Sequence, residues 1–303
     1  MVAHARNTRS VGMTVSYRAY AKINLYLDVL DRRPDGYHDI ETIFQTVGLS
    51  DKLMFSTIPR EVSLKCNVPE LDCLDSNLAY QAAMLIRERT GRKPGVHIEI
   101  EKHIPIAAGL AGGSADAAAT LVALNAIWEI ALSPSEIAEL ALELGSDVPY
   151  CTVGGTVLAT GRGERITPLK PLRRKWFILV HPAIPVSASR VYNSPRLKRN
   201  TASRVNGLTA GFRQALNALE NNDVTEAVFN RMEEAVFAEH PQLAGIKGRL
   251  LDQGCLCAAM SGSGPTVFGI CTTKKDAVRI ANMIEDYDTS VVSSVPRAVE
   301  QTE

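Results

Sequence analysis

Residues 102–121 read Lys102-His-Ile-Pro-Ile-Ala-Ala-Gly-Leu-Ala-Gly-Gly-Ser-Ala-Asp-Ala-Ala-Ala-Thr-Leu121, a glycine-rich turn that runs directly into an alanine-rich helix. Gly109, Gly112 and Gly113 lack a Cβ atom, so their backbone can adopt positive φ and approach a ligand closely. The helix behind them offers unpaired N–H groups and the positive end of its dipole. The junction predicts a phosphate site. A flexible loop before a core helix fits the same residues, and the Gly-Lys-Ser/Thr ending of a Walker loop is absent.

Length and composition indicate a globular protein of about two domains. The chain has 303 residues, 46% of them hydrophobic, and its 33 basic residues balance 33 acidic ones. A net charge of zero gives no general attraction for nucleic acid or an anionic membrane, so neither is an expected partner, although a local cationic pocket is compatible with it. No run of about eighteen apolar residues occurs, and the segment before Met13 lacks the apolar stretch of a secretory signal. We therefore expect a cytoplasmic protein.

The cysteines favour reduced, mostly buried thiols over a metal site. They form no Cys-x-x-Cys pair and have no histidine nearby at zinc-ligand spacing. Two of them are separated by one residue and would share one face of a strand, which is a weak indication of redox or metal chemistry. The six are Cys66, Cys73, Cys151, Cys255, Cys257 and Cys271.

Hydrophobic periodicity and turn residues predict an α+β protein. Strands are expected at residues 14–30, 52–58, 61–67, 96–104, 154–161, 176–180, 256–260 and 266–271, and near residue 291. Helices are expected at 76–89, with Ser76 as N-cap and Gly91 as terminator, after 113, from a capping box at Ser133, and at 204–219, 223–237, 241–252 and 274–284.

Two pairs of residues near the start could form a polar pocket. Lys22 and Asn24 lie two residues apart in an apolar strand, so their side chains share a face. Tyr37 and His38 end a turn and would suit a planar heterocycle, because they combine an aromatic face with a ring that can donate and accept hydrogen bonds. An ordinary exposed strand face and a structural Tyr-His pair explain the same residues.

Two later turns carry further candidates. Asp147 lies in a constrained turn after Gly145 and could act as a general base, although aspartate in turns more often bonds neighbouring backbone N–H groups. The stretch Ser261-Gly262-Ser263-Gly264 could cradle a phosphate or form a tight hairpin.

Taken in their order along the chain, these features resemble the GHMP kinase superfamily. That family has a lysine strand near its start, a Pro-x3-Gly-Leu-x-Gly-Gly-Ser phosphate loop and a Ser-Gly-x-Gly turn near its end. Residues 105–114 fit the loop and residues 261–264 the turn. From Ala19 onward the chain is most similar to the branch that acts on a cytidine diphosphate-linked methylerythritol, through residues 21–25, 35–38, 44–45, 145–149 and 161–164. Ala108, Ala111 and Ala115 depart from the usual Gly, Gly and Ser, which puts in doubt a hydroxyl role at Ala115.

The resemblance implies a two-domain GHMP kinase fold. Residues 14–168 would form an N-terminal domain like the second domain of ribosomal protein S5, and residues 169–303 a C-terminal ferredoxin-like α/β sandwich, with the active site between them. The implied reaction transfers the γ-phosphoryl group of ATP to the 2-hydroxyl of this small-molecule alcohol, in the non-mevalonate route to isoprenoid precursors. Mg²⁺ is expected with ATP, without a named protein ligand, and the enzyme would be a monomer or homodimer.

The resemblance also implies roles for individual residues. Asp147 would accept the hydroxyl proton, and Lys22 would orient Asp147 and offset charge near the transferring group. Tyr37 and Tyr192 would sandwich the cytosine, His38 would read its polar edge, and Asn24 would contact the substrate. The implied ATP site consists of Lys102, Pro105, Ile106, Ala107, Ala108, Gly109, Leu110, Ala111, Gly112, Gly113, Ser114 and Ala115.

Two alternatives predict different behaviour. Another GHMP kinase, acting on homoserine or phosphomevalonate, would have no use for the Asp-Gly-Tyr-His element at residues 35–38. A catalytically silent nucleotide- or RNA-binding module on the same fold would be expected to lack the lysine, the aspartate or the loop, and all three are present.

Overall fold

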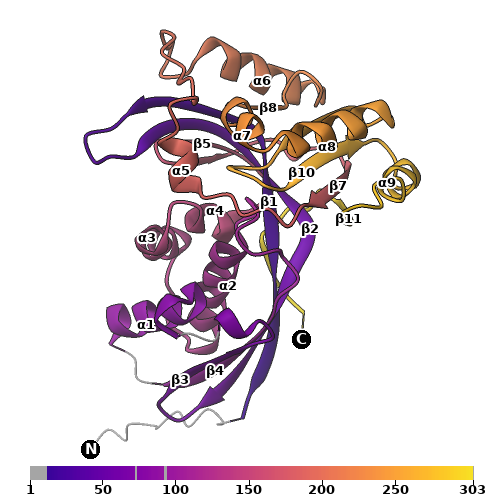
Figure 1. The fold of residues 1–303 in the computed structure, drawn as a ribbon. Helices are drawn as coiled ribbons and strands as arrows, with labels where there is room; N and C mark the ends of the chain where they lie inside the picture. The colour runs from indigo at the N-terminus through magenta and orange to yellow at the C-terminus, as the bar shows by residue number, and fades with distance from the viewer. Residues whose placement is uncertain (1–11, 72–73, 92–93, 303) are drawn as a thin grey trace, which may run out of the picture.

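The structure, a computed structural model, describes residues 12–71, 74–91 and 94–302 and consists of two β-sheets with helices packed against them (Figure 1). The larger sheet has the strand order β12-β1-β2-β4-β3, with β5 and β6 attached through β2 and with β8 attached to β1. The smaller sheet has the order β11-β7-β10-β9. This arrangement confirms the predicted α+β class. Cys73 and the segment 1–11 lie outside the described residues.

The strands are β1 (Thr14–Arg32), β2 (His38–Ile58), β3 (Val62–Cys66), β4 (Gly95–Glu101), β5 (Thr156–Thr160), β6 (Arg165–Pro168), β7 (Trp176–His181), β8 (Phe229–Asn230), β9 (Cys257–Met260), β10 (Val267–Cys271), β11 (Asp288–Ser293) and β12 (Val299–Gln301). The α-helices are α1 (Leu78–Thr90), α2 (Gly112–Ile127), α3 (Pro134–Leu144), α4 (Val148–Val153), α5 (Ala188–Tyr192), α6 (Ala210–Glu220), α7 (Glu233–Glu239), α8 (Pro241–Asp252) and α9 (Lys274–Ala281). Short 3-10 turns cover Pro69–Leu71 and Leu74–Ser76.

The antiparallel hairpin of β1 and β2 runs the length of the molecule and contacts both halves of the chain (Figure 1). Residues 19–30 of β1 are buried without interruption, because both faces of the strand are covered. The sequence prediction found residues 14–30 and 52–58, but it missed residues 38–51 of β2. Most of that segment is also buried, so it lacks the alternation that identifies a half-exposed strand.

Helices α1, α2 and α4 pack on the larger sheet, and α3 packs against these three helices. Alanines on α2 allow close contact with its neighbours, and most of the helix is buried. The predicted capping box is present, since the Ser133 and Glu136 side chains bond each other's backbone N–H groups. The N-cap of α1 is Asn77 rather than Ser76, because Asn77 Oδ1 accepts the Ala79 N–H at 2.9 Å while Ser76 ends a 3-10 turn.

The second half forms the predicted α/β sandwich. Counted in chain order, the strands of its antiparallel sheet follow the order 4-1-3-2, and α8 and α9 pack on this sheet. The helix expected at residues 223–237 was wrong, since only Glu233–Glu239 is helical there. Residues 225–227 form a turn, and Phe229 and Asn230 are extended as β8, where Asn230 and Arg231 bond to other elements. The helix expected at 204–219 begins at Ala210, where Thr209 caps it.

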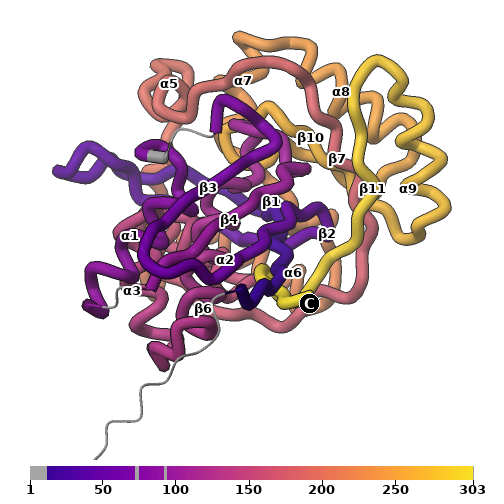
Figure 2. The backbone as a smooth tube through the Cα atoms, turned by 90° about the horizontal axis from the view of Figure 1, so that it is seen from below, coloured from indigo at the N-terminus to yellow at the C-terminus, as the bar shows by residue number. Residues whose placement is uncertain are grey.

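Two segments from the second half join the first sheet. β12 pairs with the start of β1, with Tyr17 opposite Gln301, and Figure 2 shows this yellow C-terminal segment beside the indigo beginning of the chain. β8 pairs in parallel with β1, with Tyr26 opposite Phe229. A domain division at residue 168 stays a prediction. Across the described residues, no helix has the length and apolar character needed to cross a bilayer.

Candidate active site

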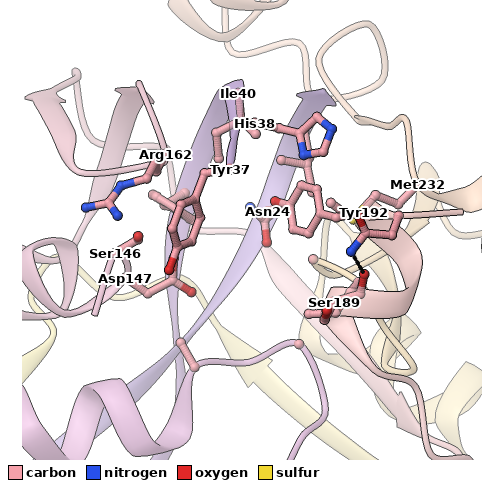
Figure 3. A pocket seen from close by; sticks show the side chains of 18 of the residues that line it. Asn24, Tyr37, His38, Ile40, Ser146, Asp147, Arg162, Ser189, Tyr192 and Met232 are labelled. Carbon is pink, nitrogen blue, oxygen red and sulfur yellow. Dashed lines mark hydrogen bonds between the residues drawn. The ribbon is translucent and has the colours of Figure 1, made fainter. Parts of the chain in front are cut away.

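A cavity of about 640 Å³ lies where the β1–β2 hairpin meets both glycine turns, the start of α4 and helix α5 (Figure 3). Residues far apart in the sequence therefore share one space. The predicted residues that line it are Lys22, Asn24, Tyr37, His38, Gly109, Ala111, Asp147, Tyr192, Gly262 and Ser263.

Lys22 lies on β1 with its ammonium group surrounded by oxygen atoms. Its side chain is nearly fully buried and donates to Asn24 Oδ1 at 2.9 Å and to the Gly109 carbonyl at 3.1 Å. Asn24 donates in turn to Thr42 Oγ1 at 2.8 Å, which fixes the amide with its oxygen toward the lysine. The Lys22–Asn24 contact agrees with the prediction that these two side chains share one face of the strand. A buried cation is thus held at a fixed position beside the phosphate loop.

Asp147 completes the group around this cation. Its Oδ2 atom lies 3.6 Å from Lys22 Nζ, and its side chain is 35% exposed toward the cavity. Asp147 is the N-cap residue of α4, but its side chain makes no capping hydrogen bond. The structural alternative, a carboxylate bonded to nearby backbone N–H groups, is therefore not what the structure shows at this turn. The carboxylate is available to a ligand and is paired with a cation.

The phosphate loop is locked against the second glycine turn. Ser261 donates from Oγ to the Gly109 carbonyl at 2.9 Å, and a Cβ built on Gly109 would lie 2.1 Å from the Ser261 carbonyl oxygen. Glycine is required at position 109 because the two turns touch, and its φ is +76°. Gly112 and Gly113 do not have positive φ, contrary to expectation; Ala107 and Ala111 adopt it instead, at 52° and 58°.

A second cavity of about 310 Å³ lies on the other side of the loop. Gly109 and Ala111 line both cavities, so the loop forms their common wall. Leu110 and Ala115 of the predicted ATP set are buried and do not line either cavity. The predicted residues along the second cavity are Lys102, Pro105, Ile106, Ala107, Ala108, Gly109, Ala111, Gly112, Gly113 and Ser114.

Lys102 belongs to a buried cluster that the sequence did not reveal. Its Nζ atom donates to Asp51 Oδ2 at 2.5 Å and to Asp116 Oδ2 at 2.7 Å. Asp51 also accepts the backbone N–H groups of His103 and Ile104, at 2.6 and 2.8 Å. Burial raises the pKa of Asp116 well above its ordinary value, although the nearby Lys102 ammonium group opposes that rise. The cluster fastens the entrance of the phosphate loop to β2 and to the first turns of α2.

Aromatic side chains form the other end of the first cavity. The His38 and Tyr192 rings are stacked, with centroids 5.4 Å apart and an angle of 17° between their planes. Tyr37 is 56% exposed and lies across the cavity from Tyr192, with the Arg162 guanidinium 4.8 Å from its ring centroid (Figure 3). Burial lowers the pKa of His38, helped by nearby arginines, which favours the neutral ring with its one donor and one acceptor.

Some cavity residues carried no sequence signal. Ser189, Asn193 and Met232 lie in the wall, but they come from stretches without a distinctive motif. Arg162 also lines the cavity and lies in residues 161–164, one of the segments that carry the family resemblance, but the resemblance implied no role for it.

The residues present fit a metal that arrives with a nucleotide. Among the described residues, no group of three or more acidic, histidine or cysteine side chains is gathered to hold a metal. Asp116 is the carboxylate that lines the second cavity, and its Oδ1 atom is buried without a hydrogen-bond partner. Mg²⁺ is commonly held by substrate phosphates and one or two carboxylates, with its remaining positions filled by water.

Comparison with known proteins agrees with this geometry. The family model for the GHMP kinases N terminal domain matches residues 77–155, and the model for GHMP kinases C terminal matches residues 206–288. A Bacillus cytotoxicus protein named 4-diphosphocytidyl-2-C-methyl-D-erythritol kinase is 44% identical over 279 residues, covering 91% of this chain and 94% of that protein.

Solved structures with the same fold include two kinases. A crystal structure of 4-(cytidine 5'-diphospho)-2C-methyl-D-erythritol kinase has a TM-score of 0.79 and 32% identity, covering 92% of this chain and 98% of that one. Homoserine kinase from Cytophaga hutchinsonii has a TM-score of 0.75 at 19% identity, covering 97% and 99%, which is a likeness of fold alone.

Proposed function

This chain belongs to the GHMP kinases, and within them to the 4-diphosphocytidyl-2-C-methyl-D-erythritol kinases, and we propose from this premise how its site carries out the reaction. The enzyme transfers a phosphoryl group from ATP to the 2-hydroxyl of 4-diphosphocytidyl-2-C-methyl-D-erythritol, in the non-mevalonate route to isoprenoid precursors. The observation that supports the site assignment is the buried Lys22 beside Asp147, 3.6 Å apart, in a cavity whose far end is aromatic.

ATP occupies the second cavity, with its triphosphate against the loop. The backbone N–H groups at the start of α2 and the positive end of that helix face this space and favour a polyanion. The loop separates the two cavities, and Gly109 and Ala111 border both of them. A γ-phosphoryl group at the loop would therefore reach an acceptor in the first cavity.

Asp147 accepts the proton of the substrate hydroxyl as the oxygen attacks. Lys22 orients that carboxylate, and it offsets negative charge near the transferring group. Phosphoryl transfer has a loose transition state, so a protein accelerates it mainly through positioning and electrostatics. A lysine fixed by Asn24 and the Gly109 carbonyl supplies both without rearrangement.

The cytidine end of the substrate lies between Tyr37 and Tyr192. The His38–Tyr192 stack already presents a flat face, and the exposed Tyr37 ring can close from the other side. The neutral His38 offers hydrogen bonds to the polar edge of cytosine, and Asn24 contacts the alcohol. An acceptor without a heterocycle would leave this half of the cavity unused.

Several finer points belong to the same proposal. Mg²⁺ enters with ATP and neutralises phosphate charge, with Asp116 and Ser114 as the side chains of the second cavity that could hold it. The balanced charge of the chain supports an enzyme without a nucleic-acid partner. We propose in addition that the enzyme is cytoplasmic and works as a monomer or homodimer.

The test is incubation of the protein with ATP, Mg²⁺ and 4-diphosphocytidyl-2-C-methyl-D-erythritol, followed by phosphorus NMR. We expect a new phosphomonoester resonance together with ADP. Parallel reactions with homoserine and with mevalonate should give none. Phosphorylation of either of these alcohols, with the cytidine compound left unchanged, would refute the substrate assignment while keeping the kinase fold.

A further inference from the structure

Residues 229–232 form a junction between the first sheet and the cavity. Phe229 and Asn230 make up β8, which pairs with β1 opposite Tyr26 and Leu27. Arg231 Nε donates to Asp28 Oδ1 at 2.7 Å, and Met232 lines the large cavity. Successive residues of one short segment thus reach the sheet, its buried carboxylate and the cavity wall.

Asn230 is the most constrained residue of this junction. Its side chain is 4% exposed, and Nδ2 donates to the carbonyls of Met260 and Gly262, at 2.7 and 2.8 Å. Its Oδ1 atom accepts the Met232 N–H at 2.9 Å. The amide orientation is unambiguous, because the reverse orientation would place an oxygen against two carbonyl oxygens.

The turn held by Asn230 lies directly against the proposed catalytic group. A Cβ built on Gly262 would lie 3.5 Å from Lys22 Nζ and from Asn24 Oδ1, and 3.4 Å from the Gly109 carbonyl. Ser261 Oγ bonds that same carbonyl at 2.9 Å. The turn therefore forms the surface against which both Lys22 and the phosphate loop rest, and a shift of its Gly262 carbonyl would lengthen the bond from Asn230.

We infer that Asn230 is a positioning residue for phosphoryl transfer, acting through the Ser261–Gly264 turn to hold Lys22 and the phosphate loop in register. This role rests on the proposed function, because it assigns Lys22 to the reaction. Asn230 does not line either cavity, so its effect should fall on the rate of the chemical step rather than on binding of the cytidine end.

The test compares Asn230→Asp, Asn230→Leu and the wild-type enzyme. A buried carboxyl can donate at most one hydrogen bond to the two carbonyls, and leucine donates none. We expect kcat to fall about tenfold in Asn230→Asp and about a hundredfold in Asn230→Leu, with KM for the cytidine substrate changed by no more than about twofold. Melting temperatures measured on the same samples establish that each variant is folded at the assay temperature.

Asn200→Ala is the matched control. Asn200 is also a side-chain amide, and its Nδ2 donates to Asp28 Oδ2 on β1 at 2.7 Å. Its side-chain hydrogen bonds go to Asp28 and Ala202 and not to the glycine turn. We expect kcat of this variant to stay within about twofold of wild type. An equal loss of kcat in Asn200→Ala and in the Asn230 variants would mean that general loosening of the sheet, rather than the turn, sets the rate, and would overturn the inference.

A double-mutant cycle asks whether Asn230 acts through the turn. Ser261→Ala removes the hydroxyl bond to Gly109 from the same turn. In the Ser261→Ala/Asn230→Asp double variant, the fold-loss of kcat should be smaller than the product of the two single fold-losses. In the Ser261→Ala/Asn200→Ala double variant, it should equal that product. A simple product for the Asn230 pair would count against the inference.

Hydrogen exchange supplies a readout that does not need turnover. In Asn230→Asp, peptides that cover residues 258–266 and 107–113 should exchange faster than in wild type, while Asn200→Ala leaves them unchanged. Unchanged exchange in Asn230→Asp would refute the link to the turn. If exchange is faster in Asn230→Asp than in wild type but the wild-type enzyme does not phosphorylate the cytidine compound, the proposed function is refuted instead.

Discussion

Replacement of Asp147 by asparagine is the sharpest test of the proposed chemistry. The substitution keeps the shape of the side chain and removes its charge and its ability to accept a proton. We expect kcat to fall by about 10²- to 10⁴-fold, the usual contribution of a positioned general base. ATP should bind as before, because its loop is held by Ser261 and Gly109 and not by Asp147.

The geometry separates this loss from a loss of stability. At the observed 3.6 Å, Coulomb's law with an effective dielectric constant of about 20 gives roughly 4.6 kcal/mol for the Lys22–Asp147 pair. Asp147 is 35% exposed, so solvent reduces the net contribution of the pair to stability to about 1 kcal/mol. The expected change in kcat corresponds to about 2.7 to 5.5 kcal/mol in the activation free energy. The increase in the activation free energy should therefore be several times larger than the loss in the free energy of unfolding.

The assay couples ADP release to NADH oxidation, with urea denaturation measured on the same preparation. Asp39→Asn is the matched control. Asp39 also pairs with a cation, Arg33 at 3.0 Å, but it lies on the β1–β2 hairpin and does not line the large cavity. We expect its kcat to stay near that of wild type. Near-normal turnover in Asp147→Asn, or a rate loss no larger than the loss of stability, would remove Asp147 from the role of base.

Three further expectations concern other parts of the molecule. Tyr37→Ala should raise KM for the cytidine substrate by about 2- to 12-fold, the worth of one aromatic stacking contact, with KM for ATP unchanged; an unaltered cytidine KM would argue against stacking. Ala111→Gly should increase the free energy of unfolding in urea by about 0.5 to 1 kcal/mol, since its φ of 58° strains any residue with a Cβ, whereas Ala126→Gly on the same helix should decrease it. Burial lowers the pKa of His181 to about 4 from an ordinary 6.5, so the unfolded chain binds this proton first. Stability should therefore fall as pH drops from about 6.5 to 4, and His181→Gln should flatten that decline in urea titrations; an unchanged slope would contradict it.

The fold was predictable where local signals were unambiguous. The capping box at Ser133, the terminating Gly91 and the helix at 241–252 depend on neighbouring residues alone, and the structure has all three. The errors arose where tertiary contacts decide. The segment before α7 carries a helical pattern, yet residues 229–230 are extended as β8, where Asn230 and Arg231 bond to distant elements. Such contacts leave no periodicity in the sequence.

The candidate site was predictable to the extent that its residues lie in motifs. Lys22 and Asn24 followed from strand alternation, but their contact with Asp147 depends on how α4 packs, which a sequence read one segment at a time does not reveal. The partners of Lys102 were missed for a related reason. Asp51 and Asp116 resemble ordinary acidic residues of a strand and a helix, and only their burial makes them a cluster.

The likeness to homoserine kinase is one of fold alone. A TM-score of 0.75 at 19% identity means that the backbone alone does not distinguish the two enzymes. The features that would recognise a cytidine ring lie at the hairpin tip, residues 33–38, and on the short helix α5, outside both family-model matches. In the proposed function, the phosphate loop and the turn beneath it position ATP and Lys22, so they would not determine which alcohol is the acceptor. Specificity should change when the hairpin tip is exchanged between such kinases, and the rate of phosphoryl transfer should depend on the junction around Asn230.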